Sequence, residues 1–143
     1  MVFRIHRAEQ HRSTVPGIEL MTLVSNHHFP RHSHDQFGIG VMAFGAQRSW
    51  SGVGLVSASA GDVIMANPGE MHDGVPLDSN ARRWRMIYID PVLLAREVEE
   101  ETVGPVEIVH ATRFWPGTSP GCLLASQPHS QIALLARRTC FAP

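Results

Sequence analysis

The stretch Gly61-Asp-Val-Ile-Met-Ala-Asn-Pro-Gly-Glu-Met-His72 decides the fold of this chain. A short apolar run ends in Asn67-Pro68-Gly69, a turn in which proline fixes φ and glycine can adopt a positive φ. Such a turn reverses the chain, so the residues before and after it are expected to form two antiparallel strands. The strand after the turn is expected to hold the imidazole of His72 in a fixed position.

The sequence pattern typical of antiparallel strands extends from Ile18 to Ile89. Short apolar stretches are separated by Gly, Pro, Asn and Asp, and no segment has a convincing helical period. Alternation predicts strands at 18–24, 37–44, 62–66 and 82–89. Gly38 and Gly40 share one face of a strand, where the missing side chain lets another strand or a ligand approach the backbone. The fold class expected is mostly β, with one antiparallel barrel or sandwich over about residues 1–90.

The β pattern ends at Asp90-Pro91, a pair typical of an N-cap followed by proline in the first helical turn. A short helix is therefore expected through Ala95. Beyond it, residues 106–109 are a candidate strand and residues 128–138 a candidate short helix. We divide the chain into a domain at 1–104 and a tail at 105–143, whose sequence is difficult to interpret.

Composition excludes several classes of protein. The chain has 143 residues, 43% of them hydrophobic and 17% charged, which is too apolar for a disordered protein. No apolar run approaches the ~20 residues that cross a bilayer, so a cytoplasmic protein without membrane contact is expected. The net charge of −1 lacks the positive field that attracts nucleic acid. Cys122 and Cys140 have no metal-binding spacing and are expected to be ordinary thiols.

Three histidines are the main candidates for a functional site. His32-Ser33-His34 has a spacing of two, which would place both imidazoles on one face of a strand running on through Phe37. This pair, with His72, could be partly buried core histidines, polar lining of a ligand pocket, or a metal site. Trp84 and Tyr88 share one strand face, as core aromatics or as pocket lining.

Arginines at 82, 83 and 85 could suggest a phosphate site. Strand alternation divides them between two faces, so a solvated sheet edge is the better interpretation. The chain also lacks GxSxG, GxxxxGK[ST] and a GxGxxG that opens a helix, which leaves hydrolase and nucleotide-binding functions without support.

The two histidine segments resemble the two sequence motifs of the cupin superfamily, a small antiparallel β-barrel. Gly61, Pro68, Gly69 and His72 match the second motif. The first motif is incomplete, because its acidic residue is absent and Ile39 is the nearest candidate. The resemblance implies a cupin-type barrel, and the missing acid puts a four-ligand metal site in doubt.

A narrower resemblance extends from Phe29-Pro-Arg-His-Ser-His-Asp-Gln-Phe-Gly-Ile-Gly40 through Gly-Glu-Met-His-Asp-Gly74 to Trp84-Arg-Met-Ile-Tyr-Ile-Asp-Pro-Val-Leu-Leu94. These segments look like the N-terminal sensor and dimerisation domain of AraC-type transcription regulators. The resemblance covers roughly residues 1–100. In that family a pair of helix-turn-helix units follows, and this chain ends before such a region could fit.

The resemblance implies a module that binds a small-molecule effector inside the barrel and pairs with its own copy or a related regulator, without binding DNA directly. The alternative is a small metal-dependent cupin enzyme, a dioxygenase or isomerase. No cofactor is favoured, and a divalent metal would use the three histidines. The candidate ligand-binding residues are His32, His34, Gln36, His72, Trp84 and Tyr88.

Overall fold

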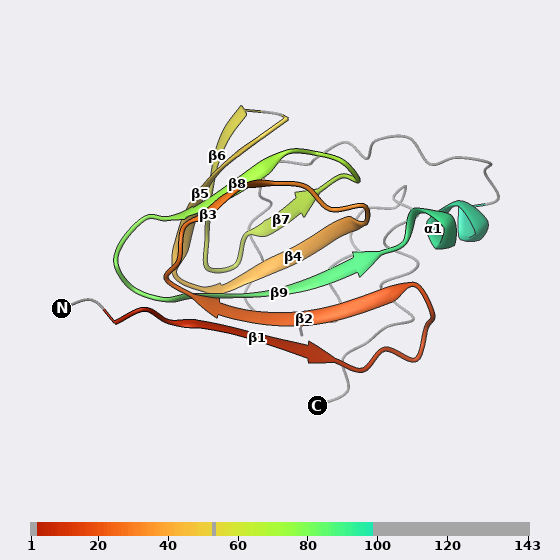
Figure 1. The fold of residues 1–143 in the computed structure, drawn as a ribbon, viewed down its shortest axis with the longest axis horizontal. Helices are drawn as coiled ribbons and strands as arrows, with labels where there is room; N and C mark the ends of the chain where they lie inside the picture. Colours follow the sequence, from red (N-terminus) through yellow and green to blue (C-terminus); the bar gives the residue numbers. More distant parts are fainter. Residues whose placement is uncertain (1–2, 53, 99–143) are drawn as a thin grey trace.

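Strands make up most of the part of the chain that the computed structural model describes, residues 3–52 and 54–98. Nine strands precede one helix, which confirms the expected mostly-β fold (Figure 1). In chain order they are β1 (His6–His11), β2 (Ile18–Ser25), β3 (Phe29–His32), β4 (Phe37–Phe44), β5 (Ala46–Ser51), β6 (Gly54–Ser59), β7 (Val63–Ala66), β8 (His72–Pro76), β9 (Arg82–Ile89) and α1 (Pro91–Val98).

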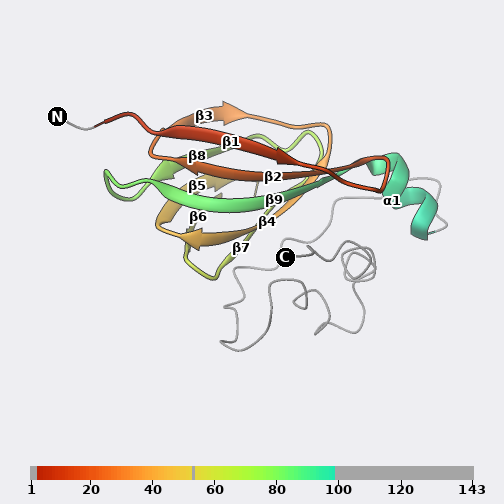
Figure 2. The ribbon, with the colours of Figure 1, turned by 90° about the horizontal axis from the view of Figure 1, so that it is seen from below.

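The strands form two sheets that face each other. The larger has the order β1-β2-β9-β4-β7, which can be followed from top to bottom in Figure 2, and the smaller has the order β3-β8-β5-β6. All pairings are antiparallel. Figure 1 shows β2, β9 and β4 side by side, with β3, β8 and β5 in the layer above them. The inner faces of the two sheets enclose the interior of the barrel.

Strand β9 lies at the centre of the larger sheet. Its residues pair with β2 on one side and with β4 on the other, so that Trp84 lies opposite Leu23 and Tyr88 opposite Gly38. Trp84, Met86 and Tyr88 therefore face the interior. A Cβ at Gly40 would lie 2.5 Å from the carbonyl oxygen of Arg85 and would also overlap the Met86 side chain. The β4 glycines thus make room for the inward side chains of β9.

The central position of β9 corrects the expectation of a solvated arginine edge. Arg82 is 1% exposed, because both edges of its strand are paired and its side chain points between the sheets. Its guanidinium donates hydrogen bonds to the Gln47 side chain and to the backbone oxygens of Ser25, His27 and Gly74. Arg82 therefore links the two sheets.

Helix α1 begins as the sequence predicts. The Asp90 carboxylate accepts a hydrogen bond from the Val92 amide at 2.7 Å, which is the N-cap interaction. Leu94, 1% exposed, packs against Phe37 and Ile89 at one end of the larger sheet. The candidate strand at 106–109 and the candidate helix at 128–138 lie outside the described residues. Within those residues, no helix has the length and apolar character needed to cross a membrane.

Candidate effector cavity

A cavity of about 590 Å³ lies between the two sheets. The larger sheet contributes an apolar wall that includes Leu23, Trp84, Met86 and Tyr88, while the smaller sheet carries the polar side chains of His32, His72, Gln47 and Ser49 beside the apolar Phe29 and Ala58. A volume of this size is within the usual range for small-molecule sites. The wall chemistry suits a molecule that is apolar on one side and polar on the other.

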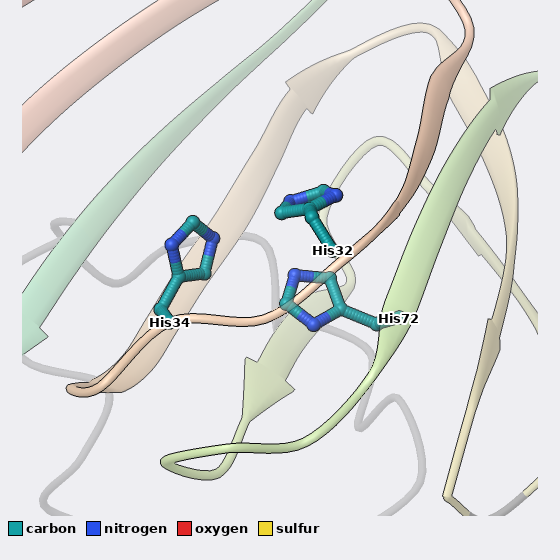
Figure 3. Close-up of side chains that lie close together, drawn as sticks. All are labelled: His32, His34 and His72. Carbon is teal, nitrogen blue, oxygen red and sulfur yellow. The ribbon is translucent and has the colours of Figure 1, made fainter.

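Three histidines meet on the polar side of the cavity. His32 ends β3 and His72 begins β8, and these two residues are paired in the smaller sheet. His34 approaches them from the connection to β4, as Figure 3 shows. The ring centroids are 4.4 Å apart for His32 and His72, and 5.0 and 5.2 Å from these two to His34. One ring nitrogen from each histidine lies within 4.8 Å of the others.

The histidines converge by a different route from the one the spacing predicts. They do not share a strand, because β3 ends at His32 and β4, which belongs to the other sheet, begins only at Phe37. The chain crosses between sheets at residues 33–36. The carbonyl of His34 accepts a hydrogen bond from the Gly69 amide at 2.7 Å, which fastens this crossing to the Pro-Gly turn. The predicted convergence is confirmed, but the predicted single strand is wrong.

Backbone carbonyls fix the orientation of two of the rings. His32 Nδ1 lies 2.7 Å from the oxygen of Pro30, and His72 Nδ1 lies 2.9 Å from the oxygen of Glu70. A carbonyl oxygen only accepts, so each Nδ1 carries the proton and donates it. In the neutral ring Nε2 is then unprotonated. His32 and His72 thus offer Nε2 lone pairs for hydrogen bonding or metal binding.

His34 and Tyr88 form the contact between the polar and apolar walls, with ring centroids 5.3 Å apart. Burial lowers the pKa of His34, and the nearby His72 and His32 lower it further. Burial raises the pKa of Tyr88, helped by the negative charge of Glu19. Both shifts favour the uncharged form, so this part of the cavity is neutral near pH 7.

The structure does not bring every candidate residue to the cavity. Trp84 and Tyr88 line it with the histidines, whereas Gln36 is absent from the lining and donates to a carboxylate oxygen of Glu19 at 3.2 Å. Sequence reasoning missed Gln47, whose buried side chain lines the cavity. The alternation of polar residues in the segment 46–51 could have revealed it as part of an inward face.

A divalent metal fits the histidine set in donor type. Three imidazole nitrogens can fill three positions of a tetrahedral site, and hydrogen bonds from the remaining ring nitrogens to carbonyls are a frequent support of such ligands. No Asp, Glu or Cys joins this cluster within the described part of the chain. Three neutral ligands would leave the double charge of the ion uncompensated.

Comparisons with known proteins agree with this architecture. Residues 21–140 match the family model of an AraC-like ligand-binding domain. A cupin 2 conserved barrel domain protein from Salinispora arenicola is similar at 21% identity and a TM-score of 0.53, over 67% of this chain and 85% of that one. Comparison with curated proteins gives no match.

Two further solved structures share the fold. The cupin domain of Cnp3 from Schizosaccharomyces pombe has 9% identity and a TM-score of 0.56, covering 69% of this chain and 76% of its own. A candidate mannose-6-phosphate isomerase from Ralstonia eutropha has 15% identity and a TM-score of 0.51, covering 62% and 85%. At these identities the likeness establishes a cupin-type barrel and nothing about activity.

Proposed function

The chain belongs to the family of AraC-like ligand-binding domains, and from this premise we propose that it senses a small-molecule effector held in the cavity between its two sheets. The observation that supports the proposal is a cavity of about 590 Å³ that has aromatic and apolar side chains on the larger sheet and a group of polar side chains, including His32 and His72, on the smaller sheet. Such two-sided lining binds a ligand by apolar burial and orients it by a few polar groups.

A thermal-shift screen of the full chain against a metabolite library tests this function. A ligand at 100 times its Kd stabilises the folded state by about 2.7 kcal/mol, which is readily detected. His72→Ala should weaken the binding of any hit by about 1–3 kcal/mol, because a buried hydrogen bond is lost. His28→Ala, on an exposed histidine outside the cavity lining, is the control and should leave affinity unchanged. Hits that bind both variants equally would contradict the proposal.

We also propose that the module acts as a dimer, with its own copy or with a related regulator, through α1 and the adjoining face of the barrel. Val92 supports this surface, because it is 68% exposed on the helix. Val92→Asp should then shift the species seen by light scattering from dimer to monomer, and a wild-type chain that is already monomeric would contradict the idea. We expect no specific DNA binding by this chain, which gel shifts at physiological salt would check.

The second candidate function is a metal-dependent enzyme, and the convergence of three histidine nitrogens favours it. A bound divalent ion would act as a Lewis acid beside a substrate in the cavity. We propose that the domain works without a resident metal, because the cluster provides no negative charge. Elemental analysis after dialysis decides between the two, since about one iron, zinc or manganese per chain would support the enzyme.

A further inference from the structure

A relay of two hydrogen bonds connects Arg82 to the wall of the cavity. The Arg82 guanidinium donates its Nε–H to Oε1 of Gln47 at 2.8 Å, and Nε2 of Gln47 donates to the hydroxyl oxygen of Ser49 at 3.1 Å. Gln47 is buried and Ser49 is half-buried, and both line the cavity from β5. The relay therefore ends on a side chain that a ligand in the cavity can reach.

Arg82 fixes the direction of both bonds in this relay. A guanidinium Nε–H can only donate, so the Gln47 atom that faces it must be the amide oxygen. The amide nitrogen then faces Ser49, and because this nitrogen can only donate, the Ser49 oxygen must accept. Within residues 3–52 and 54–98 the Ser49 side chain makes no other hydrogen bond, so its proton is left for a ligand. Ser49 thus faces the cavity as a donor, whatever the protonation state of the histidines.

Several apolar side chains share the lining with this donor. Ser49 is paired with Val56 on β6, and Val56 lines the cavity together with the buried Ala58, two residues further on. The aromatic pair of Phe29 and Trp84, with ring centroids 5.8 Å apart, lines the same cavity. A donor among apolar groups forms a stronger hydrogen bond than it forms in water, and it costs free energy when a ligand leaves it unpaired.

We propose that Ser49 orients the effector by donating a hydrogen bond to a carbonyl oxygen of a largely apolar ligand, such as a ketone or an ester, and that Gln47 and Arg82 are positioning residues that hold Ser49 in its donating state. This inference rests on the proposed sensor function and specifies its ligand class. A carbonyl oxygen accepts a hydrogen bond without bringing a proton of its own. A ligand hydroxyl would need a further acceptor for its proton, and Val56 and Ala58 beside Ser49 offer no side-chain acceptor.

Two probes that differ in one group test the proposal. Acetophenone has a carbonyl oxygen where α-methylstyrene has a methylene group, and the two molecules otherwise have the same shape. The Kd of each probe is measured by calorimetry with the full chain in EDTA, so that no bound metal differs between variants. The quantity compared is the Kd of α-methylstyrene divided by the Kd of acetophenone. The difference in hydrophobicity between the probes contributes equally to this ratio in every variant.

Removal of the Ser49 hydroxyl should abolish the preference for the ketone. Ser49→Ala should lower the ratio about fivefold, which corresponds to about 1 kcal/mol and to one neutral hydrogen bond. Acetophenone should bind more weakly, while α-methylstyrene should bind as well as before or better. Ser79→Ala removes the hydroxyl of an exposed serine outside the lining and should leave the ratio unchanged. An unchanged ratio in Ser49→Ala, or an equal change in both variants, would overturn the proposal.

Gln47→Glu tests the direction of the relay without removing it. The new carboxylate would accept hydrogen bonds from both Arg82 and the Ser49 hydroxyl, so the Ser49 proton would turn away from the cavity. The ratio should then fall as far as it does in Ser49→Ala. Urea unfolding should show that the variant keeps its fold, because the buried guanidinium gains a charged partner. A variant with altered stability and an unchanged ratio would give Gln47 a structural role only and would overturn its positioning role.

The outcomes separate this inference from the sensor function. If the ratio does not respond to Ser49→Ala, the ligand class is wrong. If neither probe binds at millimolar concentration, the ligand class is wrong too. In both cases the metabolite screen, which assumes nothing about Ser49, decides separately whether the domain is a sensor.

Discussion

Replacement of Arg82 by methionine should destabilise the protein strongly, because the side chain is buried and fully hydrogen-bonded. The side chain is 1% exposed, and its guanidinium makes four hydrogen bonds. Bonds from a charged donor contribute about 1.5–3 kcal/mol each, or roughly 6–12 kcal/mol for four. Burial lowers the pKa of Arg82 from 12.5 to about 10, which corresponds to a cost of about 3 kcal/mol for the charged form. When this cost is subtracted from the lower figure for the hydrogen bonds, the predicted loss in the free energy of unfolding is at least about 3 kcal/mol.

This value agrees with the ~3–5 kcal/mol typical of breaking a buried charged network. Urea unfolding followed by tryptophan fluorescence measures it, with equal m-values required for the comparison. Arg83→Met is the matched control, because Arg83 lies on the other face of the strand and its buried Nε has no hydrogen-bond partner. We expect the control to change stability by no more than about 0.5 kcal/mol. A loss below about 1 kcal/mol for Arg82→Met, or equal losses for both variants, would refute the argument.

Two further predictions concern the glycines and the Pro-Gly turn. Gly40→Ala should cost about 1–3 kcal/mol in urea unfolding, since its Cβ would overlap the Arg85 backbone, whereas Gly38→Ala would meet only movable side chains and should cost less. Glu70 accepts hydrogen bonds from Gly52 and Asn67; burial acts to raise its pKa, but these bonds outweigh it and the pKa is lowered. The contribution of Glu70 to the free energy of unfolding is therefore complete above about pH 4.5, and it is lost as the pH falls through the lower pKa that Glu70 has in the folded protein. Glu70→Gln should make the free energy of unfolding depend less on pH in this acid range. An unchanged pH dependence would contradict the stabilising role of the Glu70 carboxylate.

Local pattern was sufficient to predict the strands with one regularly buried face. The predicted strands at 18–24 and 82–89 correspond closely to β2 and β9, because buried and less buried residues alternate over the first six residues of each strand. The strands β1, β5 and β6 were not predicted. They are polar or rich in serine, and β1 is exposed on nearly all its residues, so no apolar alternation marks them.

Features that depend on which strands are neighbours were not predictable from local pattern. The burial of Arg82 follows from the pairing of β9 on both edges. A short stretch of sequence does not reveal which strands are paired. The site histidines were found because the Pro-Gly turn and the HxH spacing are local signals. Their true arrangement, with His32 and His34 on either side of a crossing between sheets, required the topology. Gln36 was assigned to the site from proximity in sequence, and the crossing carries it to Glu19 instead.

The chemical character of the cavity depends on the backbone as much as on the side chains that line it. An imidazole alone offers one donor and one acceptor, and either nitrogen could face a ligand. The carbonyls of Pro30 and Glu70 remove this choice, since each holds the proton of one ring on the side away from further partners. The first carbonyl lies within the short strand β3 and the second follows the Pro-Gly turn, and these are the segments that also bring His32 and His72 together. The same local folding that assembles the site therefore also fixes the tautomers of His32 and His72.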